Sequence, residues 1–306
     1  AAQRLGPDQV RTGERVVAAR ETANGAVAEI LHADGTRSER ACDILVGADG
    51  IHSALRQQFH PDEGAPRWNG MMMWRGTTLA RPFLDGRTMV QAGHRRAKFV
   101  VYPIEPVRPD GLQRINWICD RRLREDGFGG GLTAPSREDW SKPGSLDDLL
   151  PTFGSWRFAW LDVPGLIRAA EQILEWPMVD RNPLPRWRHG HTTLLGDAAH
   201  PMYPIGSNGA TQAILDAAAL ADALDGHASI TAALNAYEAA RLPMTRDIVA
   251  MNRREGLDAI LDMVEEAAPE GFARIEDVTD PTVLAEWVQA YKKAAGHQVG
   301  RPQAAP

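Results

Sequence analysis

The feature that most constrains the fold is a glycine-acid turn between a buried strand and a helix in the second half of the chain. Residues 192–195 (TTLL) form an apolar strand, Gly196 and Asp197 follow, and a long loop leads to an alanine-rich helix. Because glycine tolerates backbone angles that other residues avoid, Gly196 lets the chain turn sharply. The order strand, turn, helix is typical of α/β proteins, in which ligands lie at the carboxyl ends of the strands.

Two parts of this run suit a polar ligand. The Asp197 carboxylate can accept hydrogen bonds from the hydroxyls of a polyol. A helix begins where the loop ends. Its free backbone N–H groups and its positive end can stabilise negative charge on a ring system. An ordinary Gly-Asp turn with a glycine helix cap is the simpler alternative, but the whole run favours a ligand site. Its residues are Gly196, Asp197, Pro204, Gly206, Ser207, Asn208, Gly209 and Ala210.

A second glycine-acid turn lies near the start of the chain, in DILVGADGIHSALR over residues 43–56. A strand runs into this turn, and Asp49, Gly50, Ser53 and Arg56 follow. They supply a carboxylate, a hydroxyl and a guanidinium near the amino end of one helix, which suits a phosphate or a ribose. In the alternative interpretation Asp49 is only a helix N-cap and Arg56 a solvated helix residue.

The rest of the chain divides by its hydrophobic pattern. Apolar runs at 15–19 and 26–32, separated by Asn24-Gly25, predict a hairpin, and residues 42–48 predict a buried strand. Alternating apolar segments between residues 71 and 179 predict an antiparallel sheet. Helical spacing of apolar residues dominates after the alanine-rich helix.

Composition excludes several classes of function. The net charge is -6 and the basic residues are scattered, so we expect no nucleic-acid surface. Cys42 and Cys119 lack a CxxC spacing and adjoin apolar residues, which indicates reduced thiols in a cytoplasmic protein. No apolar run of transmembrane length occurs, so no membrane partner is expected. His189 and His191 have no further His or Cys nearby, and we predict no metal site.

Together the two turns resemble those of the group A flavoprotein monooxygenases, the para-hydroxybenzoate hydroxylase superfamily. LVGADGIHSALR matches the family's DG motif and LLGDAAHPMYPIGSNG its GD motif, in family order. The segments MWRGTT, VVYPI and WPMVDRNPLPRW are similar to the branch of phenazine-modifying and salicylate-hydroxylase-like enzymes.

The resemblance implies that FAD is the cofactor, with the DG motif near its pyrophosphate and the GD motif at its ribityl chain and flavin. It further implies NADH or NADPH as a transient co-substrate, O2, and hydroxylation of a small aromatic substrate through a flavin C4a-hydroperoxide. The expected fold is α/β (α+β), with an incomplete Rossmann-like FAD-binding domain, an antiparallel-sheet substrate domain and C-terminal helices. The expected ranges are 1–66 and 181–225 for the FAD-binding domain, 67–180 for the substrate domain and 226–306 for the helical region and polar tail.

The sequence departs from the family pattern in one respect. Family members begin with a strand, a GxGxxG turn and a helix, and no such segment occurs here; the glycines of residues 127–131 do not join a strand to a helix. We therefore expect a truncated form, whose partner is either the missing N-terminal fragment or a second copy in a homo-oligomer. An epoxidase or antibiotic-inactivating monooxygenase of the same superfamily remains an alternative. An inactive remnant that binds an aromatic ligand or a partner chain without FAD is another.

No catalytic residue is assigned with certainty, because the cofactor carries the organic chemistry. The residue His200 is interpreted as part of the flavin loop rather than as a base, and Arg181 as pairing with Asp180. Aromatic walls with a few polar groups suit a planar substrate, and Arg75 or Lys98 could bind its carboxylate. Core packing or surface charge is the alternative for each pocket candidate. These candidates are Trp74, Arg75, Lys98, Tyr102, Met202 and Tyr203.

Overall fold

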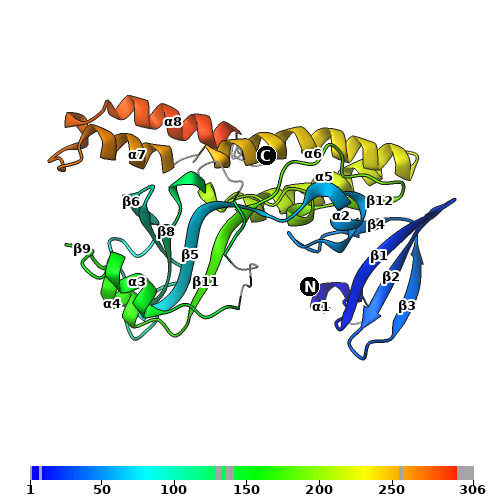
Figure 1. The fold of residues 1–306 in the computed structure, drawn as a ribbon, viewed down its shortest axis with the longest axis horizontal. Helices are drawn as coiled ribbons and strands as arrows, with labels where there is room; N and C mark the ends of the chain where they lie inside the picture. The colour runs from blue at the N-terminus through cyan, green and yellow to red at the C-terminus, as the bar shows by residue number, and fades with distance from the viewer. Residues whose placement is uncertain are drawn as a thin grey trace, which may run out of the picture. The chain divides into compact units, whose positions relative to one another are not determined.

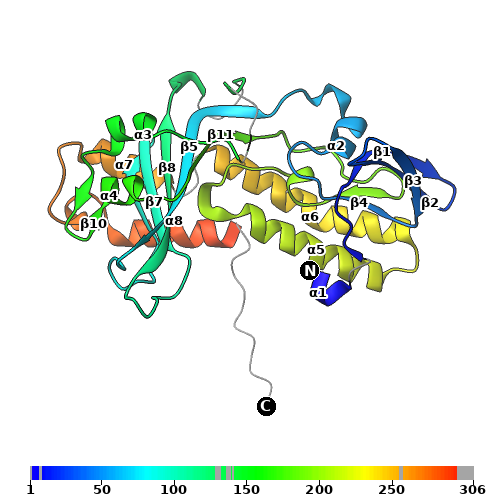
Figure 2. The ribbon, with the colours of Figure 1, turned by 90° about the horizontal axis from the view of Figure 1, so that it is seen from below.

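The chain folds into two units of mixed α/β structure (Figures 1 and 2). The structure, a computed structural model, describes residues 2–6, 9–127, 132–135, 139, 141–254 and 258–294. Unit 1 comprises Ala1–Ala65 and Asp180–Asn252, and unit 2 comprises Pro66–Val179 and Arg253–Pro306. Most of the glycine cluster at 127–131 and the end of the polar tail lie outside the described residues.

Unit 1 contains a three-stranded antiparallel sheet formed by β1 (Glu14–Thr22), β2 (Gly25–His32) and β3 (Arg37–Cys42). The predicted hairpin is confirmed, and Gly25 is required there because a Cβ would lie 2.2 Å from the Cys42 carbonyl oxygen. The third strand was not predicted. Its sequence RSERAC is largely exposed, so it lacks the alternation of polar and apolar residues that marks a half-buried strand.

The two glycine-acid turns follow neighbouring strands. The short strand β4 (Leu45–Gly47) pairs in parallel with β12 (Thr192–Leu194), with Gly47 opposite Leu194. The amide of Leu195 donates to the Gly47 carbonyl oxygen at 2.9 Å. Because parallel strands end at the same edge of a sheet, the DG and GD turns leave that edge together.

Helices pack around this strand pair. The helices α5 and α6 run side by side in both views (Figures 1 and 2), and Leu194, Leu234 and Tyr237 are fully buried between the elements of this core. The helical elements of unit 1 are α1 (Ala2–Leu5), α2 (Ala54–Phe59), η2 (Pro61–Glu63), η4 (Gly196–Ala198), η5 (Ile205–Ser207), α5 (Gly209–Gly226) and α6 (Ile230–Arg253).

Unit 2 is built on a five-stranded sheet in the order β11-β5-β8-β7-β6. The pairs β5–β8, β8–β7 and β7–β6 are antiparallel, which confirms the sheet predicted between residues 71 and 179. The strands are β5 (Arg67–Ala80), β6 (Val90–His94), β7 (Ala97–Pro103), β8 (Gln113–Arg122) and β11 (Ile173–Asp180). The further elements are η3 (Glu125–Gly127), α3 (Leu146–Phe153), β9 (Arg157–Phe158), β10 (Leu161–Asp162), α4 (Val163–Arg168), α7 (Asp258–Ala267), η6 (Ile275–Asp277) and α8 (Pro281–Ala294).

One face of this sheet packs against α3 and α4, two helices that the sequence pattern did not reveal. The Phe99 ring lies 6.3 Å from the ring of Phe153 in α3, and the Thr78 hydroxyl donates to the Leu166 carbonyl oxygen in α4. Among the described residues, no helix is both long enough and apolar enough to cross a bilayer.

Gly76 provides a test of how tightly this face is packed. A Cβ at Gly76 would lie 2.3 Å from the Trp117 ring, which is fully buried. We expect Gly76→Ala to lower the free energy of unfolding by about 2 kcal/mol, because the tryptophan must leave its position. Denaturant unfolding followed by tryptophan fluorescence measures this. Gly226→Ala is the control, since a Cβ there meets nothing within 4 Å; equal effects of the two changes would contradict the packing argument.

Candidate functional site

The GD turn presents one carboxylate outward from a buried backbone. Gly196 has φ +61°, a conformation that favours glycine, and a Cβ there would approach the Cβ of Ala213 to 3.2 Å. Ala198 and Ala199 behind the turn are fully buried, whereas Asp197 is exposed. Desolvation by the surrounding protein raises the pKa of Asp197, and the charge of His200 acts in the opposite direction. The side chain is thus available to a ligand.

The loop before α5 adopts two successive left-handed residues. Gly206 has φ +72° and Ser207 has φ +56°, the latter uncommon for a residue with a side chain. Such strain is concentrated at functional sites. The loop runs directly into the amino end of α5, whose first N–H groups have no acceptors within the helix.

The Asp197 carboxylate lies close to the amino end of α5. The nearest atom to a Cβ built on Gly209 is Oδ1 of Asp197, at 3.9 Å. A carboxylate that accepts hydroxyl hydrogen bonds therefore lies beside N–H groups that favour negative charge. Their chemistry suits the hydroxyls of a ribityl chain and the ring of a flavin, and the assignment of these residues to FAD stays a prediction. Of the other predicted residues in this loop, Pro204 and Ala210 are exposed and Asn208 is buried.

The DG turn forms the amino end of α2. Ser53 is the N-cap, because its hydroxyl accepts from the Arg56 amide at 3.0 Å, and Asp49 accepts from the Ala54 amide at 2.8 Å. Gly50 has φ +77°. A cavity of about 420 Å³ adjoins this turn, lined by Glu14, Arg15, Val16, residues 45–49, His52, Ala54 and Leu55. The interpretation of Asp49 as the N-cap is therefore wrong, although its carboxylate accepts from the first amide of α2 and borders the cavity.

Arg56 joins the two turns from inside the protein. It is 1% exposed, so the interpretation of Arg56 as a solvated helix residue is wrong. Its guanidinium donates to the carbonyl oxygens of Ala198 (3.0 Å) and Ala199 (2.8 Å) in the GD turn and forms an ion pair with Glu63. The observed partners are protein groups, and a direct contact of Arg56 with the cofactor stays a prediction.

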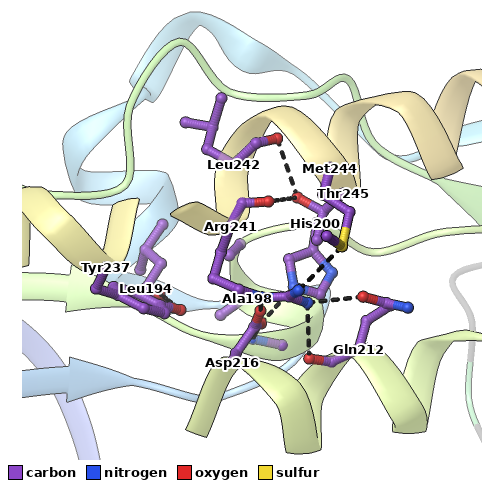
Figure 3. Close-up of polar contacts among 12 residues, drawn as sticks. Leu194, Ala198, His200, Gln212, Asp216, Tyr237, Arg241, Leu242, Met244 and Thr245 are labelled. Carbon is purple, nitrogen blue, oxygen red and sulfur yellow. Dashed lines mark hydrogen bonds and ion pairs between the residues drawn. The ribbon is translucent and has the colours of Figure 1, made fainter. Parts of the chain in front are cut away.

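His200 is held by a carboxylate that the sequence analysis did not single out. Its Nε2 lies 2.5 Å from Oδ2 of Asp216, and the residue is 3% exposed (Figure 3). The same Oδ2 accepts from the Gly196 amide at 3.0 Å. The only available signal was an acidic residue on the core-facing side of an apolar helix, four residues before the buried Leu220.

The predicted pocket residues of unit 2 lie on both faces of its sheet. The strand register puts Arg75, Lys98 and Tyr102 on one face, and Trp74 on the face that α3 and α4 cover. Trp74 is 2% exposed and its Nε1 donates to Glu175, which fits core packing. Met202 and Tyr203, in unit 1, are both buried.

Two of the three residues on the first face already bind protein groups. Lys98 forms ion pairs with Asp120 (3.1 Å) and Asp258. Burial acts to lower the pKa of Lys98, but these two carboxylates outweigh it and raise that pKa. Arg75 is exposed and its Nε donates to Asn116 at 2.6 Å. Arg75 is thus the better placed of the two for a substrate carboxylate, and that role stays a prediction.

The remaining candidates have structural partners. Nε2 of His189 lies 3.3 Å from Nε2 of His60, and burial lowers the pKa of His189 to about 4. Arg181, which the sequence predicted to pair with Asp180, forms an ion pair with Glu63 at 3.3 Å, and pairing with Asp180 stays a prediction. Both cysteines are free, as predicted. Within the described part of the chain, no group of three or more His, Cys, Asp or Glu side chains could hold a metal ion.

Comparison with known proteins identifies the family. A family model described as "FAD binding domain" matches residues 1–133 and 162–252. The chain belongs to this family. It is 45% identical over 258 residues to phenazine 1,6-dicarboxylic acid hydroxylase PhzS of Lysobacter antibioticus, a match that covers 82% of this chain and 61% of the relative. It is 29% identical to salicylate hydroxylase of Pseudomonas putida, covering 72% of this chain and 52% of that protein.

The fold is also that of solved FAD enzymes. A crystal structure of Klebsiella pneumoniae HpxO complexed with FAD and uric acid matches with a TM-score of 0.64 and 24% identity, covering 96% of this chain and 65% of that one. The chain spans 61% and 59% of the length of the first two curated relatives it matches.

Whether Arg56 holds the DG and GD turns together can be tested by substitution. We expect Arg56→Met to lower the free energy of unfolding by about 2 to 4 kcal/mol, because the carbonyl oxygens of Ala198, Ala199 and Asn182 lose this donor and Glu63 keeps only its ion pair with Arg181. Thermal and denaturant unfolding measure this. Arg40→Met, which removes an exposed ion pair with Glu14, is the matched control and should change little. A similarly small change in the free energy of unfolding for Arg56→Met would show that Arg56 does not hold the two turns together.

Proposed function

We propose that this chain binds the flavin and the substrate in an FAD- and NAD(P)H-dependent monooxygenase. The enzyme hydroxylates a small aromatic compound with O2. The observation that carries the proposal is the exposed Asp197 carboxylate beside the amino end of α5, at the end of the β4–β12 strand pair. The relative PhzS is a phenazine 1,6-dicarboxylic acid hydroxylase, and this supports an aromatic substrate.

The residues of this chain have distinct roles in the proposal. Bound FAD supplies the redox chemistry with O2 and the nicotinamide. Asp197 accepts hydrogen bonds from the ribityl hydroxyls and fixes the cofactor along the turn. The N–H groups at the start of α5 stabilise negative charge that develops on the flavin ring when it is reduced.

The proposed substrate residues lie on the face of the unit 2 sheet that carries the exposed Arg75. Arg75 is the cationic group we assign to a substrate carboxylate, because an arginine binds carboxylates through two parallel hydrogen bonds. Its hydrogen bond to Asn116 holds the guanidinium in one orientation. Tyr102, half-buried on the same face, offers an aromatic surface to the ring.

The cofactor role is tested by FAD titration of the purified chain. We expect FAD fluorescence and visible absorbance to change on binding, and Asp197→Ala to weaken binding at least about tenfold, since a hydrogen bond to a charged group contributes about 1.5 to 3 kcal/mol. Asp222→Ala, an exposed carboxylate on α5, should bind FAD as the unaltered chain does. A chain that leaves the FAD signals unchanged would contradict the proposal and favour a remnant without cofactor.

A further inference from the structure

The buried charges behind the GD turn form a cluster that belongs to no ligand contact described above. We call Asp216, His200, Arg241, Gln212 and the amide of Gly196 the Asp216 cluster (Figure 3). Asp216 and Gln212 are 0% exposed, His200 3% and Arg241 5%. Burying an aspartate is costly unless hydrogen bonds and an opposite charge compensate it, so the arrangement calls for a specific explanation.

Asp216 accepts from three donors, two in the GD turn and one in α6. Oδ2 accepts from the Gly196 amide at 3.0 Å and from Nε2 of His200 at 2.5 Å. Oδ1 accepts from Nε of Arg241 at 2.7 Å. One carboxylate thus connects the first and last residues of the GD turn with α5, which carries Asp216, and with α6, which carries Arg241.

The surrounding contacts leave this carboxylate little freedom. Arg241 also donates through Nη2 to Oε1 of Gln212 at 2.7 Å, so its guanidinium bridges two residues that are four positions apart on one face of α5. The Thr245 hydroxyl bonds the Arg241 carbonyl oxygen at 3.2 Å. Burial acts to raise the pKa of Asp216, but the hydrogen bonds and the positive partners outweigh it and lower that pKa. The group therefore stays an anion, and an anion can only accept hydrogen bonds.

We propose that Asp216 is a positioning residue for flavin binding: it fixes the GD turn to α5, so that the Asp197 carboxylate points toward the amino end of the same helix. This deepens the proposed function and rests on it. Asp197 directly follows Gly196 in the chain, and the amide of Gly196 is one of the three groups that Asp216 holds. The helix that presents N–H groups to the cofactor thereby also sets the direction of the carboxylate beside them.

The geometry also assigns the proton on His200. Because the ionised Asp216 only accepts, Nε2 of His200 must carry a hydrogen. Among the described residues, Nδ1 of His200 has no hydrogen-bond partner. The hydrogen on Nε2 of His200 therefore reports on the carboxylate at position 216.

Asp216→Asn tests the positioning role of the carboxylate while the volume of the side chain stays the same. Asparagine has the same shape but only one accepting oxygen, so it cannot serve donors on both sides; an NH2 group then faces either Arg241 or the pair formed by Gly196 and His200. We expect amide hydrogen exchange over residues 195–200 to become at least about tenfold faster, and the Kd for FAD to rise at least about tenfold. We also expect the nitrogen NMR signal of Nε2 in His200 to shift, because the group that accepts its hydrogen has changed.

Asp247→Asn is the matched control. Asp247 lies on the same helix as Arg241 and is exposed. This change should alter neither the FAD affinity nor the exchange of residues 195–200. If Asp216→Asn does not fold, as judged by circular dichroism, Arg241→Lys is measured instead, since it keeps the positive charge but loses the bridge to Gln212; it should accelerate exchange over 195–200 by at least about threefold.

The readouts distinguish the two proposals. Absence of FAD binding by the unaltered chain would contradict the proposed function, while exchange and the Nε2 signal of His200 would still decide whether Asp216 fixes the turn. Unchanged exchange and an unchanged Nε2 signal in Asp216→Asn would overturn the positioning role. That role would also be overturned if Asp216→Asn frees the turn and yet leaves the Kd for FAD unchanged.

Discussion

The parallel pairing of β4 with β12 is the contact on which the candidate site depends. Each strand contributes only three residues, Leu45–Gly47 and Thr192–Leu194. So short a pair supplies few hydrogen bonds and cannot by itself hold two glycine turns in a fixed relation. The turns nevertheless have to be held, because a carboxylate and a helix end bind one ligand only when their spacing is constant.

Buried charged side chains hold the two turns in place, which the short strand pair cannot do by itself. Arg56 reaches from the DG turn to the carbonyl oxygens of Ala198 and Ala199, and Asp216 reaches from α5 to the amide of Gly196. In the GD turn, the positively charged Arg56 thus binds two carbonyl oxygens, and the negatively charged Asp216 binds an amide. A buried ion pair adds little net stability compared with apolar packing, but breaking one leaves an unpaired charge, so it strongly disfavours other conformations. These residues therefore select one arrangement of the backbone.

The sequence predicted the parts of this site that depend on local backbone geometry. Gly196, Gly206 and Gly50 have positive φ angles, and glycine followed by polar residues indicates such turns directly. The sequence could not predict Arg56 as an internal clamp, because its acceptors lie more than 140 positions away. Asp216 was missed for a similar reason. An acidic residue in an alanine-rich helix is expected to face solvent, and its partner Arg241 lies on another helix, α6. The helix α3 was missed because its short segment contains Pro151, and β3 because its residues are mostly exposed.

The two carboxylates adjacent to Gly196 differ in environment, and this difference separates their roles. Asp216 is fully buried, yet its donors lower its pKa, so it remains charged and permanently bonded to protein groups. Asp197 is exposed at the turn and has a raised pKa, and the described residues offer it no comparable set of donors. Environments that shift two neighbouring acids in opposite directions commonly mark a division of tasks. A structural anion behind the turn leaves the carboxylate in front free to accept hydrogen bonds from a polyol, which is what the ribityl chain of FAD requires.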